Sequence, residues 1–99
     1  MTPHYSFEAE VWLYQGRDPW HFASLPADVS DAIEARTIDR KVAFGSVRVN
    51  VRIGQTTWAT SLFPDKESQG YVLPLKKAVR VAEGLSEGDV VSLELELAE

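Results

Sequence analysis

The sequence contains no cysteine among its 99 residues. Disulfides and thiolate metal sites are therefore excluded, and the absence suits the reducing cytosol, where we expect the protein to act. The two histidines, His4 and His21, lack the short spacing of a zinc-binding motif. Glycine-rich phosphate loops and the glycine pattern of a nucleophilic serine are missing as well. We therefore expect no metal, no cofactor and no catalytic site, and rank an enzyme last among the functions considered.

Long apolar runs and an excess of positive charge are also missing. No run approaches the roughly 20 apolar residues of a membrane span, and the first residues lack the basic and apolar regions of a signal peptide. The net charge is −5, which opposes binding to nucleic acid because non-specific binding depends on cationic surface. The length of 99 residues fits a single domain over 1–99, for which we expect no membrane association.

What the sequence does contain is a regular alternation of apolar and polar residues, which is typical of strands with one buried face. The alternation predicts six strands, at 5–14, 20–24, 46–53, 56–63, 71–73 and 91–97. Gly54-Gln55 favours a type II′ hairpin turn between the third and fourth strands. Pro64 is expected to end the fourth strand, because proline cannot donate to a strand ladder.

Two short helices are predicted between the strands, each with a narrow apolar stripe at intervals of three or four residues. The first helix begins at Pro26, and its stripe comprises Val29, Ala32, Ile33 and Arg36. The second follows Pro74 and ends at Gly84, and its stripe comprises Leu75, Ala78, Val79 and Ala82. The side of the second helix that faces solvent is expected to carry Lys76, Lys77, Arg80 and Glu83.

These elements predict the fold class. Strands with one polar and one apolar face need closure to hide their edges and to fill a core. We therefore predict a mostly β fold with two short α-helices, in which a closed or pseudo six-stranded β-barrel is capped by the helices.

Several blocks of sequence point to a known family. They are Trp58–Pro64, Gly70–Arg80 and Gly88–Val91, with further matches at Trp20–Phe22 and Leu25-Pro26. Across nearly the whole chain these blocks resemble the prokaryotic domain of unknown function 1905 family. The resemblance implies a small bacterial-type β-barrel domain, sometimes joined to other domains in longer chains. It supplies no activity.

Residues 72–95 also resemble, at the level of fold, the swapped-hairpin proteins of the AbrB and MazE type. The shared pattern is a strand ending in Leu73-Pro74, a helix carrying Arg80, and Gly88-Asp89 before a last strand. It implies a related fold unit and, as an alternative function, a dimeric nucleic-acid-binding module. Because turn chemistry alone produces such a pattern, it supports the fold more than DNA binding.

A candidate site gathers aromatic, hydroxyl and basic residues around the second helix. Lys76 and Lys77 stand in its first turn, where cations oppose the helix dipole. A bound carboxylate or phosphate would offset that cost, and so would a nearby Asp65 or Glu67. Aromatic side chains beside hydroxyls and a cation are typical of small-molecule pockets. The predicted ligand-binding residues are Trp58, Ser61, Tyr71, Lys76, Lys77 and Arg80.

Other interpretations of the same residues stay open. A solvated helix face accounts for the basic residues, and packing at the barrel end accounts for the tryptophans. Cross-strand ion pairs are expected among the outward charges, Glu8, Glu10, Glu94, Glu96, Arg48 and Arg52. The leading function is a non-enzymatic module that binds a small anionic or polar molecule or a partner, as a monomer or weak homodimer.

Overall fold

The computed structural model describes residues 3–39 and 45–98, which form six strands and two helices. The strands are β1 (His4–Tyr14), β2 (Trp20–Ser24), β3 (Val47–Ile53), β4 (Thr56–Asp65), β5 (Gly70–Pro74) and β6 (Val90–Leu97). The helices are α1 (Ala27–Thr37) and α2 (Lys77–Glu83). Each predicted element is therefore present, within a few residues of its predicted ends.

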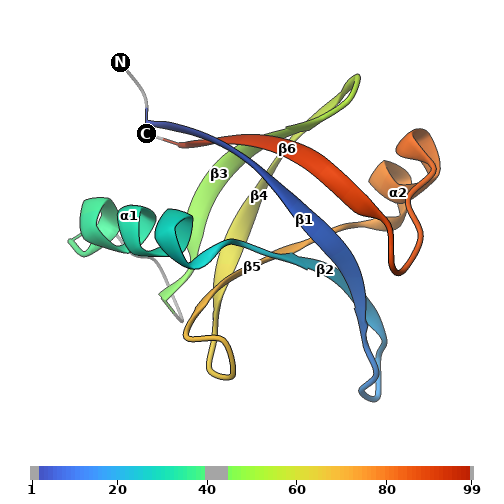
Figure 1. The fold of residues 1–99 in the computed structure, drawn as a ribbon, viewed down its shortest axis with the longest axis horizontal. Helices are drawn as coiled ribbons and strands as arrows, with labels where there is room; N and C mark the ends of the chain where they lie inside the picture. Colours follow the sequence, from blue (N-terminus) through green and yellow to red (C-terminus); the bar gives the residue numbers. More distant parts are fainter. Residues whose placement is uncertain (1–2, 40–44, 99) are drawn as a thin grey trace.

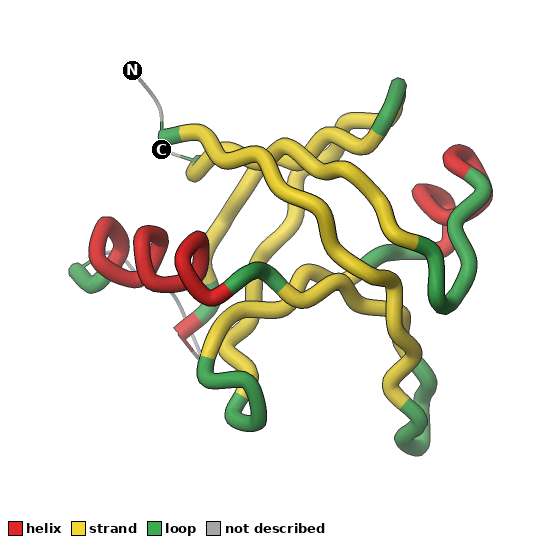
Figure 2. Tube along the Cα trace, in the orientation of Figure 1, coloured by secondary structure: helices red, strands yellow, loops and turns green. Residues whose placement is uncertain are grey.

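The strands close into an antiparallel barrel in the order β1-β2-β5-β4-β3-β6 (Figure 1). β1 closes the barrel because it is long enough to pair with β6 through its first part and with β2 through its last. The two helices lie on opposite sides of the strands (Figure 2). These observations confirm the predicted mostly β fold with a six-stranded barrel and two helices.

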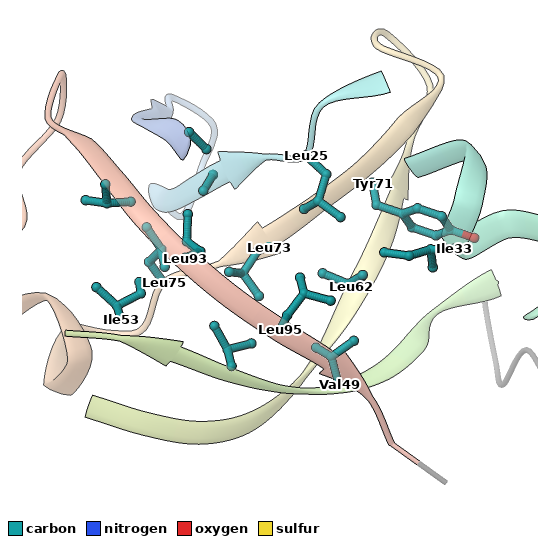
Figure 3. Close-up of a cluster of buried hydrophobic side chains, with 14 of the residues drawn as sticks. Leu25, Ile33, Val49, Ile53, Leu62, Tyr71, Leu73, Leu75, Leu93 and Leu95 are labelled. Atoms are coloured by element: carbon teal, nitrogen blue, oxygen red, sulfur yellow. The ribbon is translucent and has the colours of Figure 1, made fainter. Parts of the chain in front are cut away.

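The interior of the barrel is filled mainly by alternate residues of the strands. Four side chains of β3 and four of β6 are buried at every second position, namely Val47, Val49, Val51, Ile53, Val91, Leu93, Leu95 and Leu97. Leu62 of β4 and Leu73 of β5 meet this group in the centre (Figure 3). Burial of one such side chain stabilises the fold by about 1.5–3 kcal/mol, so this core is the main source of stability.

The hairpin between β3 and β4 has the predicted geometry. Gly54 has φ +58°, whereas Gln69 alone among the described non-glycine residues has a positive φ. Gln55 therefore has a negative φ, and a positive φ at only the first loop residue is the signature of a type II′ turn.

Pro64 does not end β4, contrary to the prediction. The strand continues to Asp65, and Pro64 lies opposite Tyr71 of β5. β3 pairs with β4 only as far as Leu62. The N–H that Pro64 lacks would point toward β3, and because β3 does not pair with β4 at this position, no ladder hydrogen bond is lost. A proline is tolerated in the strand at this position.

The stripe predicted for α1 is wrong at two positions, because Ala32 and Arg36 are exposed. The buried residues of the helix are Ser30, Ile33 and Thr37. Two of them are polar, and both make a hydrogen bond. The Ser30 hydroxyl oxygen accepts from the backbone N–H of Tyr71 at 3.1 Å, and the Thr37 hydroxyl donates to the carbonyl of Ile33 at 2.7 Å.

The stripe predicted for α2 is also corrected. Val79 is the buried residue of this helix, whereas Ala78 and Ala82 are exposed. Leu75 is buried, as predicted, but it precedes the helix. A helix of 7 residues makes about two turns, so one face has room for about two side chains and not for a longer stripe. Neither α1 nor α2, the helices in the described ranges, is long and apolar enough to cross a membrane.

Candidate functional site

The structure brings together two of the six predicted site residues. Trp58 of β4 and Lys76, the residue before α2, line the same pocket of about 520 Å³. The pocket walls are mainly apolar, and its lining consists of Trp20, Phe22, Trp58, Ala59, Thr60, Phe63, Pro64, Val72, Pro74 and Lys76. We call it the seam pocket, since it lies where β4 and β5 separate.

Tyr71 lies elsewhere. Its ring is buried, and its hydroxyl donates to Glu34 Oε2 of α1 at 2.6 Å. Figure 3 shows the ring beside Ile33, on the α1 side of the core. The proximity of Tyr71 to Pro74 in sequence is not proximity of their side chains, because α1 and α2 cover opposite sides of the barrel.

Ser61, Lys77 and Arg80 do not line the seam pocket either. Ser61 is opposite Arg48 in β3, three residues along β4 from Trp58 and thus on the other face of the strand. Lys77 is exposed at the first position of α2. Arg80 is half-buried rather than fully solvated, because its Nε donates to the carbonyl of Leu75 at 3.0 Å.

The separation of β4 from β5 follows from hydrogen-bond directions. The backbone N–H of Leu25, just after β2, donates to the carbonyl of Tyr71 in β5. The backbone N–H of Leu75, just after β5, donates to the carbonyl of His21 in β2. The backbone groups of odd-numbered β5 residues therefore face β2, and those of Val72 and Pro74 face β4. Val72 is opposite Phe63, the last pair of the ladder between β4 and β5. Pro74 has no N–H, so it cannot donate the next hydrogen bond of this ladder to β4. The β4–β5 pairing stops after three pairs, and the strands diverge beyond it.

A side-chain hydrogen bond joins the start of β4 to α2. Thr56, at the start of β4, donates its hydroxyl proton to Glu83 Oε2 of α2 at 2.6 Å. Glu83 is half-buried, which corrects the prediction that it faces solvent. This contact, together with the burial of Val79, holds α2 against the barrel beside the pocket.

Sequence reasoning missed the aromatic wall of the pocket. Trp20 and Phe63 are exposed by 51% and 41%, and Phe22 is half-buried. Phe22 stacks against Trp12, with ring centroids 5.1 Å apart, and the Trp12 indole N–H donates to Ser24 at 2.9 Å. Part of the signal was available, because alternation places Trp12 on the outward face of the first strand, where a large apolar side chain is unexpected.

The outward charges pair differently from the prediction. Within the described residues one contact of this kind forms, His4 Nε2 with Glu94 Oε1 at 3.3 Å, which is an ion pair only when the histidine is protonated, and both side chains are half exposed. Arg52 lies opposite Glu94 in the register, but its Nε donates to the carbonyl of Gly54 at 3.2 Å. The local hairpin carbonyl is therefore the partner of Arg52, and the predicted arginine–glutamate pairs are wrong.

The described residues include no group of three or more His, Asp or Glu side chains that could hold a metal ion. A second hollow, of about 480 Å³, lies on the outer faces of β3, β4 and β6, and its polar side chains include His4, Asn50, Arg52 and Glu94. Trp58 lines both hollows, and each has one Lys or Arg side chain, but the seam pocket has three further aromatic side chains, Trp20, Phe22 and Phe63, and no carboxylate.

Two comparisons with known proteins bear on identity. A search of curated protein sequences finds no match to the chain. Residues 7–95 match the family described as Domain of unknown function (DUF1905), and this match covers all six strands at least in part. The chain therefore belongs to the domain of unknown function 1905 family.

Proposed function

We propose that this protein is a non-enzymatic binding module for a small molecule that combines an aromatic or apolar body with an acidic group. The observation that supports the proposal is the composition of the seam pocket, where Trp20, Phe22 and Phe63 provide apolar walls and Lys76 provides a cation. Its volume of about 520 Å³ suits a small-molecule ligand. The walls would hold the body by burial of apolar area, and Lys76 would orient the acidic group.

This proposal narrows the anionic or polar ligand predicted from the sequence. The nucleic-acid alternative has less support, because the net charge is −5 and Lys76, Lys77 and Arg80 sit on and beside one helix of 7 residues. It remains a prediction, testable by a gel shift at low salt. We expect the module to act in the cytosol as a monomer or weak homodimer.

The test is a titration calorimetry experiment with indole-3-acetate and its uncharged analogue indole-3-acetamide. We expect the acid to bind more tightly, and Lys76→Gln to weaken its binding by about 1.4- to fivefold, since an exposed ion pair contributes about 0.2–1 kcal/mol. Trp20→Ala removes part of the aromatic wall and should weaken both compounds about tenfold.

Lys77→Gln is the matched control, because Lys77 is the neighbouring exposed lysine and does not line the pocket. It should bind indole-3-acetate as the wild type does. Equal losses in Lys76→Gln and Lys77→Gln, or no binding by any aromatic acid of a panel, would contradict the proposal.

A further inference from the structure

The open part of the seam leaves one edge of β4 without a strand partner. Phe63 is paired with Val72, so its backbone groups face β5, and those of Thr57, Ala59 and Ser61 face the same side. In the described ranges no strand pairs with β4 on this side before Phe63. Thr57 and Ala59 are exposed and Ser61 is half-buried, so a ligand can reach this edge.

We propose that the ligand of the seam pocket is an extended peptide segment that adds to β4 along residues 57–61 as an extra strand. This inference rests on the proposed function, since it names the class of molecule that the seam pocket takes. The edge is about 16 Å long at about 3.3 Å per residue, which matches a peptide of five residues. Main-chain hydrogen bonds to an exposed edge provide affinity in this mode of recognition, and side-chain pockets provide specificity.

The surroundings of the edge specify the chemistry of the peptide. The seam pocket borders the edge at Ala59 and Thr60, so alternate apolar side chains of a bound strand would reach Trp20, Phe22 and Phe63. Lys76 lines the seam pocket and is exposed where the chain leaves β5 for α2. An acidic side chain on the peptide complements this lysine, whereas a basic one would be repelled. The partner is therefore an extended peptide with alternating aromatic residues and a carboxylate.

The fold also explains why β5 does not pair with this edge of β4, which leaves the edge available to a peptide. Pro74 cannot donate toward β4, and Leu75 donates to His21 of β2 instead, so the chain leaves β4 and follows β2. A bound peptide supplies the N–H groups that Pro74 lacks. A ligand held only by burial of its apolar groups in the seam pocket would not need an extended backbone. A peptide bound through main-chain hydrogen bonds to β4 would need one, so an experiment can separate these two kinds of ligand.

The test uses a fluorescein-labelled peptide, Thr-Phe-Ser-Phe-Glu, with its C-terminus amidated, followed by anisotropy. Two isomers keep all side chains but carry N-methyl groups either on both phenylalanines or on the serine and glutamate. In a strand these two sets of N–H groups face opposite edges. We expect one isomer to bind at least tenfold more weakly than the parent peptide and the other to bind within twofold. Ser61→Pro, which removes an N–H from the β4 edge, should also weaken the parent peptide about tenfold, with folding checked by thermal unfolding.

Equal binding of both isomers, or equal loss in both, would overturn the inference without any variant protein. If indole-3-acetate binds but the peptide does not, the peptide inference fails and the proposed small-molecule function stands. If neither binds, both fail together.

Discussion

The hydrogen bond between Thr56 and Glu83 is the contact whose removal tests the described packing of α2 most cleanly. It joins the start of β4 to the last turn of a helix that buries one side chain, Val79, against the barrel. Thr56→Val keeps the shape of the side chain and suits a strand, but leaves the half-buried Glu83 carboxylate without this donor. Hydrogen bonds to charged groups contribute about 1.5–3 kcal/mol, and partial exposure of both partners reduces this to about 1–2 kcal/mol.

We therefore expect Thr56→Val to lower the unfolding temperature by roughly 4–16 °C, given about 4–8 °C per kcal/mol for a domain of this size. Hydrogen exchange of the α2 amides should accelerate more than that of the β3 and β6 amides, because α2 is the element released. Both quantities can be measured on the same sample, by thermal unfolding and by exchange followed with NMR.

Thr57→Val is the matched control, since Thr57 is the next residue of β4 and its side chain is exposed. It should change stability by no more than about 0.5 kcal/mol. A Thr56→Val variant as stable as the wild type, or a Thr57→Val variant that loses as much stability as Thr56→Val, would contradict this account of α2 packing.

Three further perturbations follow from the same structure. Leu73→Ala removes a fully buried side chain from the centre of the barrel and should cost about 2–5 kcal/mol in urea unfolding, whereas Val81→Ala, at a residue exposed by 72%, should cost less than about 0.5 kcal/mol. Gly54→Ala should destabilise by more than about 1 kcal/mol in thermal unfolding, because φ is +58° and the added Cβ would collide with the Glu83 carboxylate, whereas Gly84→Ala has a similar φ but open space around it and should cost less. Tyr71→Phe should lose about 1 kcal/mol with its bond to Glu34 yet bind indole-3-acetate unchanged in calorimetry, and weaker binding would place Tyr71 back in the site.

The alternation of the strands made the barrel predictable. Every second residue of β3 and β6 is apolar, so one face of each strand must be buried while Arg48, Arg52, Glu94 and Glu96 stay outside, and a closed barrel satisfies this requirement. The helix faces were harder to predict. Ala32, Ala78 and Ala82 fit an apolar stripe, but exposure of such a small side chain costs little free energy, so the structure can leave them in solvent. Ser30 and Thr37 are buried in α1 instead, since the Ser30 hydroxyl accepts from Tyr71 of β5 and the Thr37 hydroxyl donates to the Ile33 carbonyl within the helix.

The candidate site was predictable only in part. Lys76 and Trp58 are 18 positions apart in sequence, and their meeting depends on β4 and β5 being neighbours in the barrel. Tyr71 contacts α1 instead, where its hydroxyl donates to Glu34, and α1 lies on the opposite side of the barrel from α2 (Figure 1). Pro74 was interpreted from sequence as the end of a strand, which is correct. Pro74 also ends the pairing of β5 with β4 and so opens the seam. This effect could be recognised only once the register of the β4–β5 pairing was known.

The central claim is that the opening between β4 and β5 is where this protein binds its ligand. The most direct measurement is a ¹⁵N–¹H chemical-shift map recorded during a titration with indole-3-acetate. We predict the largest changes at the indole N–H groups of Trp20 and Trp58 and at the amides of Ala59, Phe63 and Val72, with α1 unchanged. Changes centred on Glu34 and Tyr71, or on the outward face around Arg52 and Glu94, would contradict it.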